Sequence, residues 1–558
     1  MRRFSLLRLS LCGISLVILC SCLFSHAQPL QSSDSTVPAG RVVLVLPFDN
    51  RSGQPDLGWI GESFPDTLNQ RFNSAGFLTI SRDDRQYALD HLGLPPDFRP
   101  TRATTIRIAQ TLDANYVVIG SYNVSRGRIS VQSQVLEINN LRMSSPLEDS
   151  SELARLFDVQ NAIAWKIARQ MDPQFNVAQQ TFLAAPGQVR LSSFENYIRG
   201  ISTSTPQERI KRLQFAVQES PTYAAALLAL GKSQYIARDY DHAAITLARI
   251  PASDRRSLEA NFYLGLARFN SGRYADAEKA FAFVASRLPL PEVINNQAVA
   301  SSRQGHNATA LFERAVAADP NDADYHYNLA VSLLRQGDFA RAQTEVGQTL
   351  RLRPNDSEAP ELKALISFGR PPSPIVLPTS KPSNPASTSL QKPASASGSA
   401  FEPLERIRRT YSEASFRQAA FQLDQIRAAR MATLPPAQQV AQYVQLGRDY
   451  LAQGLVPEAE QEFQSALSIN SSSADARAGL SQVRELSGDT AAARSEAQAS
   501  LQLSPNATAY LVLARIELHD NQVAASAADV GKALKLEPNN TAALGMKQAL
   551  AARGQNLP

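Results

Sequence analysis

The chain has 558 residues, a formal net charge of +5 and 19% charged residues, and this length predicts several domains. All three cysteines lie within the first 27 residues. A chain cleaved after residue 27 therefore has no disulfide, no thiolate metal site and no cysteine nucleophile. The same cleavage removes three arginines and lowers the net charge to +2. The remaining basic residues form no dense run, which argues against nucleic-acid binding.

Residues 1–27 have the pattern of an export signal. A basic start precedes an uncharged apolar run over residues 9–24, and Ser25-His26-Ala27 offers small residues where signal peptidase reads the chain. The run is short for a membrane span of about 20 residues, so a retained anchor is the less favoured alternative. Leu19-Cys20-Ser21-Cys22 resembles a weak lipobox, with Cys22 as the lipid-bearing residue. We predict a periplasmic protein, with an outer-membrane lipoprotein as the alternative.

Residues 41–172 have the pattern of one α/β domain. A continuous apolar run predicts a strand buried on both faces, and a later alternating run predicts a strand with one wet face. The expected strands cover 41–48, 77–80, 116–122 and 129–135, and the expected helices cover 59–75, 83–92, 104–112 and 151–171. The turn at 125–128 joins the last two strands as a hairpin.

Two sequence segments in this domain resemble those of a known family. The segment Val45-Leu46-Pro47-Phe48-Asp49-Asn50-Arg51-Ser52-Gly53 and the segment Ala114-Asn115-Tyr116-Val117-Val118-Ile119-Gly120-Ser121 resemble the TolB amino-terminal-like domain, which also occurs in the CsgG and FlgO envelope lipoproteins. The step Asp158-Val159-Gln160 into a final helix fits the same pattern. The resemblance implies an envelope or assembly module that is not a catalyst and is often followed by helical repeats.

Beyond this domain the chain repeats itself about every 34 residues. In residues 192–368 helix pairs centre on Leu230-Gly231, Leu264-Gly265, Gln297-Ala298 and Leu329-Ala330. Residues 371–400 are rich in proline, serine and alanine, which predicts a disordered linker. Such a linker would let the helical repeats before it and after it move separately. The period returns over residues 402–552, with its best copy around Leu446-Gly447. We expect two all-α solenoid arrays after the α/β domain.

The period, the small residues between helices and the closing prolines resemble the tetratricopeptide repeat. Each unit is a helix pair that cannot bury its apolar face alone, so stacked units share a core and form a curved surface. The small residues are expected where helices approach closely, and they are structural: Gly231, Gly265, Gly447, Ala243, Ala277, Ala342 and Ala459.

The resemblance places a groove along the first helices of each repeat. It maps Tyr235, Phe262, Phe269 and Tyr327 to this groove, as candidate anchors for protein segments. The alternative is that these rings pack between helices. The mapped surface has few charges, with Lys232 nearly alone, so we expect apolar contacts and no clamp for a terminal carboxylate.

No catalytic, cofactor-binding or metal-binding residue is predicted. The mature chain has five histidines, and none stands in an HExxH or in a recognisable nucleophile arrangement. The sequence also has no GxSxG motif and no phosphate loop of the GxxxxGK(S/T) kind. The loop Asp49-Asn50-Arg51-Ser52-Gly53 follows a buried strand, where α/β proteins bind ligands, but a tight turn explains it as well.

We therefore expect a non-enzymatic adaptor of the bacterial envelope that binds segments of other proteins. Two alternatives stay open: a lipid-anchored assembly factor of the outer membrane, and a regulatory or enzymatic subunit whose α/β domain binds a small molecule.

Overall fold

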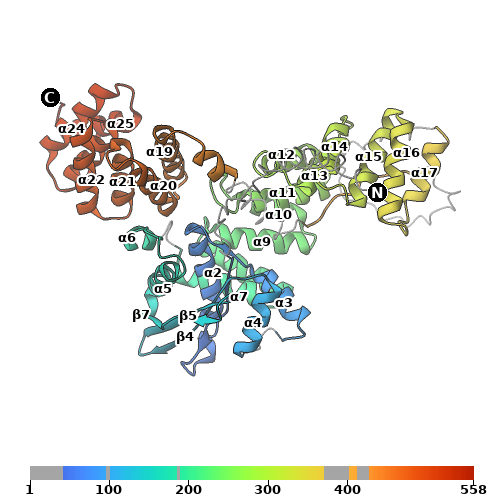
Figure 1. Cartoon of the computed structure of the whole chain (residues 1–558), viewed down its shortest axis with the longest axis horizontal. Helices are drawn as coiled ribbons and strands as arrows, with labels where there is room; N and C mark the ends of the chain where they lie inside the picture. The colour runs from blue at the N-terminus through green and yellow to red at the C-terminus, as the bar shows by residue number, and fades with distance from the viewer. Residues whose placement is uncertain (1–41, 96–100, 185–188, 370–400, 411–425, 558) are drawn as a thin grey trace, which may run out of the picture.

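The structure is a computed structural model that describes residues 42–95, 101–184, 189–369, 401–410 and 426–557. The predicted signal with Cys22 and the predicted linker 371–400 lie outside the described residues. Figure 1 shows an α/β domain below two helical arrays, which extend from it in opposite directions. Among the described residues, no helix combines the length and apolar character needed to cross a membrane.

The α/β domain contains a mixed sheet. Its central strand order is β3-β1-β4-β5-β6, with β2 paired to β4 and β7 paired to β5. Strand β1 pairs parallel with β3 and β4, and β2 pairs parallel with β4. Strand β5 pairs antiparallel with β4, β6 and β7. The strands are β1 Val42–Val45, β2 Asp49–Asn50, β3 Leu78–Thr79, β4 Tyr116–Ser125, β5 Arg128–Glu137, β6 Arg142–Met143 and β7 Leu147–Glu152.

Helices cover both faces of this sheet, which is why β1 is apolar on both sides. Val43 and Val45 face the cluster that contains α2 and α5, whereas Leu44 faces the cluster that contains α3 and α4. The helices are η1 Pro55–Leu57, α2 Trp59–Ser74, α3 Arg82–His91, α4 Arg102–Thr111, η2 Leu153–Arg155 and α5 Leu156–Met171.

The predicted strands and helices of this domain are present with small shifts at their ends, but β2, β6 and β7 were not predicted. The sequence of β7, Leu-Glu-Asp-Ser-Ser-Glu, has no apolar alternation, and its side chains are half-buried or exposed. It forms because ladder hydrogen bonds to β5 satisfy its backbone. The predicted final helix starts later than expected, at Leu156, because β7 and η2 occupy residues 147–155.

The first helical array begins against the α/β domain. Trp59 of α2 and Phe194 of α7 pack edge to face at 6.2 Å between ring centroids, and Tyr197 donates to Asp66 at 2.8 Å. One apolar cluster runs from β1 through these helices to α12. The short helix α6 Gln179–Leu183 lies in the segment that connects the α/β domain to this array. The helices of the array are α7 Leu191–Ser202, α8 Pro206–Glu219, α9 Ala224–Ile236, α10 Tyr240–Leu247, α11 Ser257–Asn270, α12 Tyr274–Ala285, α13 Pro291–Ser302, α14 Thr309–Ala318, α15 Ala323–Gln336, α16 Phe339–Leu352 and α17 Ala359–Ser367.

The second helical array starts later than the sequence predicted. Residues 401–410 are not helical, and they lie against the first array although they were assigned to the second. The repeats of the second array begin at α19, and its helices are α19 Pro436–Ala452, α20 Val456–Ile469, α21 Ala474–Leu486, α22 Thr490–Leu503, α23 Ala507–His519, α24 Val523–Leu536 and α25 Thr541–Ala552.

The small repeat residues lie at close helix contacts. A Cβ atom on Gly231 would lie 2.5 Å from Leu247, and one on Gly265 or Gly447 would lie 2.7 Å from Phe281 or Phe463. Such distances are shorter than real side-chain contacts, so a larger residue at these positions would force the facing side chain to shift. The four predicted alanines are fully buried: Ala243, Ala277, Ala342 and Ala459.

Candidate peptide-binding groove

Residues 401–410 lie across the first helices of the last repeats in the first array. Their contacts come from α13, α15 and the start of α17, together with the residues next to these helices. Pro403 and Glu405 are buried, whereas Leu404 between them is 44% exposed. Alternating burial is the pattern of an extended chain. The first array therefore holds a segment of its own chain as an extended peptide.

Two asparagines bind the backbone of this segment. Asn328 on α15 accepts from the Arg406 N–H at 2.7 Å and donates to its carbonyl at 2.8 Å. Asn296 on α13 does the same at Arg408, at 2.8 and 2.7 Å. Asn295 adds a donor to the Arg406 carbonyl at 3.0 Å and accepts from Asn328 at 2.7 Å. A side-chain amide has one donor and one acceptor face, so it can replace a neighbouring strand.

The side chain of Arg406 lies in an acidic pocket. Its guanidinium donates to both carboxylate oxygens of Asp356 at 2.7 Å, and it also bonds Glu358 at 2.9 Å and Asp324 at 2.9 Å. Its carbon Cζ lies 3.7 Å from the ring centroid of Tyr327. Hydrogen bonds from Arg406 hold the pKa of Asp356 well below its usual value, with smaller contributions from backbone N–H groups. The pocket therefore suits a planar cation that can donate two parallel hydrogen bonds to Asp356 and stack on the ring of Tyr327.

Arg408 and Glu405 make charged contacts on either side. Arg408 pairs with Asp322, and also with Asp324 at 3.3 Å, and its guanidinium lies 5.3 Å from the ring centroid of Tyr325. The Glu405 side chain is fully buried and pairs with Arg335 and, at 3.8 Å, with Arg303. The Ser302 hydroxyl also bonds this carboxylate. A buried carboxylate needs such partners, because burial without them is costly.

The four predicted groove aromatics do not share one environment. Tyr327 is fully buried and its ring lies under Arg406. Phe262 is 1% exposed and packs edge to face on Phe281, so it belongs to the helical core. Tyr235 is half-buried beside Tyr240 and Tyr263, and Phe269 is half-buried and packs on Tyr274 at 5.2 Å.

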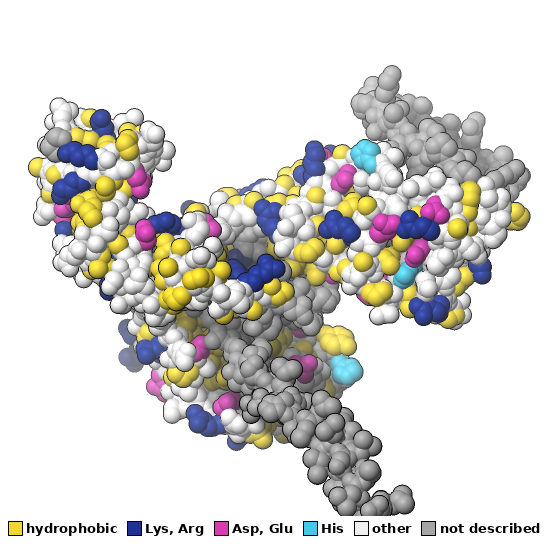
Figure 2. All heavy atoms as spheres, turned by 45° about the horizontal axis from the view of Figure 1, so that its top comes forward, with side chains coloured by type: hydrophobic (Ala, Val, Ile, Leu, Met, Phe, Trp, Pro, Cys, Tyr) yellow, Lys and Arg dark blue, Asp and Glu magenta, His cyan; other side chains and the backbone are white. Residues whose placement is uncertain are grey.

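The prediction of a groove with few charges is wrong for this part of the array. Figure 2 shows basic and acidic side chains side by side on the arm that the first array forms. The groove acids and amides recur one repeat apart, which is a signal that the sequence contains. Asn295 and Asn328 form one such pair, and Asp322 and Asp356 form another. The residues predicted for the groove were aromatic anchors, and the polar positions of the same helices were missed.

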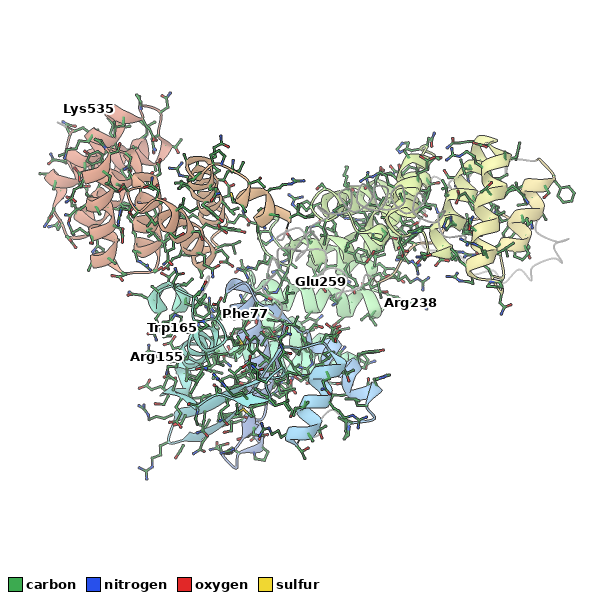
Figure 3. The ribbon with its side chains drawn as sticks, in the orientation of Figure 1. Phe77, Arg155, Trp165, Arg238, Glu259 and Lys535 are labelled. Atoms are coloured by element: carbon green, nitrogen blue, oxygen red, sulfur yellow. The ribbon has the colours of Figure 1, made fainter. Side chains whose placement is uncertain are left out.

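Lys232, the groove cation noted in the sequence, is engaged elsewhere. Its ammonium group lies 2.7 Å from Glu259, which Figure 3 labels, and 5.1 Å from the ring centroid of Tyr263. The groove near α9 and α11 therefore differs in charge from the acidic pocket at α15 and α17.

The second array has an open concavity on its own first helices. A cavity of about 710 Å³ is lined by α19, α21 and α23, and includes Arg448, Gln482, Glu485 and Arg515. Arg515 pairs with Glu485 at 2.5 Å across neighbouring helices. Arg448 pairs with Asp475 at 2.7 Å, so both arginines of this cavity are paired within the second array.

The second array also contacts the segment that connects the α/β domain to the first array. Glu460 on α20 accepts from the Ala178 N–H at 3.0 Å and pairs with Arg484 on α21 at 2.7 Å. Arg484 also donates to Thr181 at 2.8 Å. Trp165, labelled in Figure 3, holds the same segment by donating to the Val177 carbonyl at 3.0 Å. These bonds dock α20 and α21 beside α6.

The α/β loop that could have held a ligand uses its polar groups in a turn. Asn50 accepts from the Ser52 N–H at 2.9 Å and donates to the Gln54 carbonyl at 2.8 Å. Gly53 has a φ of 69°, which favours glycine. No cluster of three or more metal-ligating side chains occurs in the part of the chain that the structure describes.

Comparison with known proteins agrees with the repeat geometry. Family models described as tetratricopeptide repeat match residues 228–286, 300–366 and 444–508. These segments are tetratricopeptide repeats. Such repeats bind proteins or peptides on their curved surfaces, so the matched segments imply a protein-interaction scaffold.

Individual relatives are distant. A putative adenylate cyclase 3 from Rhizobium meliloti (strain 1021) is 24% identical over 203 residues, which cover 34% of this chain and 32% of that protein. The match thus spans about a third of that relative's length. The LpoB C-terminal domain from Escherichia coli is 25% identical and covers 20% of this chain and 83% of its own, with a TM-score of 0.18. YrrB, described as a TPR protein with an unusual peptide-binding site, is 14% identical, with a TM-score of 0.28. The match covers 36% of this chain and 98% of YrrB.

Proposed function

We propose that this protein is an exported, non-enzymatic adaptor of the bacterial envelope, and that the groove of its first array binds extended segments of partner proteins. The observation that carries this proposal is the pair of asparagines, Asn296 and Asn328, each of which bonds both the N–H and the carbonyl of one residue in an extended segment. Backbone bonds of this kind do not depend on the identity of the side chains, so they suit a groove for segments of other proteins.

The proposed envelope location is supported by the export pattern of residues 1–27 and by the TolB-like sequence segments of the α/β domain, residues 45–53 and 114–121. In this proposal the α/β domain contacts an envelope partner or a second copy, and the arrays hold the client segments. Mass spectrometry of the mature amino terminus separates the two anchoring alternatives. A free protein begins at Gln28, and a lipoprotein begins at a lipidated Cys22.

The groove is tested by site-specific crosslinking. A photoreactive phenylalanine analogue replaces Tyr327, which lies at the floor of the groove. Illumination of intact cells is expected to give crosslinks to envelope proteins, and adding Asn296→Ala and Asn328→Ala is expected to remove them. A matched control places the same probe at exposed Ile245 on α10. Identical crosslinks from both positions would contradict a specific groove.

A further inference from the structure

We propose that the groove of the first array selects extended segments with the pattern glutamate, arginine, aliphatic residue, arginine, and that residues 405–408 of this chain are an internal ligand with that pattern. This inference rests on the proposed function, because it names the kind of segment that the groove binds and the contact that regulates access to it. Its basis is the set of contacts that each of the four side chains makes.

The asparagines determine the register of the bound segment. They bond the backbone at Arg406 and at Arg408, which are two residues apart. In an extended chain residues two apart point to the same side. A bound partner must therefore place two side chains, also two residues apart, toward the acidic positions at Asp322, Asp324 and Asp356.

Arginine fits the Arg406 position better than lysine does. The Asp356 side chain is only 3% exposed, and its two oxygens receive two parallel N–H bonds. The flat face of the same guanidinium lies on Tyr327. Lysine has a compact ammonium group that can make neither the fork nor the stack. A neutral residue would remove these two bonds and leave the buried carboxylate with only Arg353 at 3.4 Å and two backbone N–H groups.

Glutamate fits the preceding position because its surroundings have the opposite charge. The Glu405 side chain is fully buried between Arg303 and Arg335. Arg335 also donates to the Pro403 carbonyl at 3.2 Å, and Arg303 to the Glu405 carbonyl at 3.2 Å. A segment with the charges in reverse order would place arginine against arginine here and glutamate against the acids, so the groove discriminates by repulsion as well as attraction.

The aliphatic position is set by the apolar floor between repeats. Ile407 is half-buried and packs on the two clusters that Phe269 also borders. The side chain on this side of the segment therefore contacts the repeat core, while the arginines on the other side meet the acids. Together the four positions define a pattern with alternating demands, which a random basic segment does not meet.

The internal ligand competes with any partner. It belongs to the same chain as the groove, and a tethered ligand has an effective concentration on the order of millimolar. A partner segment therefore binds weakly until the internal segment leaves. The affinity of the groove for free segments is expected to rise when the two arginines that hold the internal segment are removed.

The test uses the full chain and a fluorescein-labelled synthetic peptide with the sequence of residues 401–410. Binding is measured by fluorescence anisotropy. The R406A/R408A variant is expected to bind the peptide at least about tenfold more tightly than the unmodified chain, because its own segment no longer competes. R409A is the matched control, since it removes an exposed arginine of the same segment, and it is expected to bind like the unmodified chain.

A second peptide tests the pattern. It carries glutamine in place of Arg406 and Arg408 and keeps Arg409. The R406A/R408A chain is expected to bind it at least about tenfold more weakly than the first peptide. Equal binding of both peptides would overturn the pattern while leaving a peptide-binding groove in place. Equal binding of the first peptide by all three chains would overturn internal competition. If the R406A/R408A chain binds neither peptide, the proposed function fails together with this inference.

The R406A/R408A variant removes the two N–H bonds from Arg406 to Asp356, so circular dichroism is used to check that it stays folded. If the variant does not fold, the R406K/R408K variant is used in its place. This variant keeps both charges and loses the fork and the stack, so it is expected to bind the first peptide several-fold more tightly than the unmodified chain. Unchanged binding in a folded R406K/R408K chain would overturn the assignment of arginine to these positions.

Discussion

Two glycine-to-alanine substitutions of identical chemistry are expected to have opposite effects. Gly265 lies within α11, and a Cβ atom there would meet three atoms of the Phe281 ring at 2.7, 2.8 and 2.9 Å. Phe281 is fully buried and held by Phe262, so its ring has little room to move. Gly347 lies within α16, and a Cβ atom there would meet nothing within 4 Å.

Both substitutions gain about 1 kcal/mol of helix propensity. At Gly265 this gain is offset by an overpacking cost of about 1–3 kcal/mol. Gly265→Ala is therefore expected to change local stability by about 0 to 2 kcal/mol in the destabilising direction, and Gly347→Ala to stabilise by about 1 kcal/mol. The difference between them, about 1–3 kcal/mol, isolates the contact with the ring because the propensity cancels.

Hydrogen exchange read by mass spectrometry is the suitable assay, because a chain of several domains does not unfold in one step. Each variant is compared with the unmodified chain in its own helix pair. Exchange is expected to become faster in α11 and α12 for Gly265→Ala, and slower in α15 and α16 for Gly347→Ala. Equally slowed hydrogen exchange in both variants would refute the reasoning, since it would mean that the Phe281 ring moves aside at no cost in free energy.

Two further predictions concern ion pairs. His326 has a raised pKa because it bonds Glu345 at 2.6 Å, so its contribution to stability is complete below about pH 6.5 and is lost as pH rises through the raised value. His326→Gln is expected to remove this pH dependence from the melting of the first array, and an unchanged profile would contradict it. Arg484→Ala leaves the fully buried Glu460 without its ion-pair partner and is expected to destabilise the second array by about 3–5 kcal/mol. Arg477→Ala, which removes a half-exposed pair, is expected to cost less than about 1 kcal/mol; equal costs in urea unfolding would refute the distinction.

Local pattern was enough to predict most of the elements. The apolar run of β1 predicted burial on both faces, and helices do cover both faces of the sheet. The repeat period placed Gly231, Gly265 and Gly447 at close helix contacts, because a 34-residue helix pair must pack on its neighbour in the same way each time. The exposed strand β7 escaped prediction, since its pairing depends on β5 and not on its own residues.

The groove required the tertiary structure. Asn296 and Asn328 are ordinary polar residues in the sequence, and only the stacking of α13 on α15 brings both to one backbone. The segment that they bind lies far along the chain, and its position depends on contacts between residues more than 70 apart in sequence. By itself, the sequence determined the repeat period, the helices and the small residues that let the helices meet, because these depend on local spacing. Which surface holds the segment, and which charges surround Arg406, was decided only when distant helices came together.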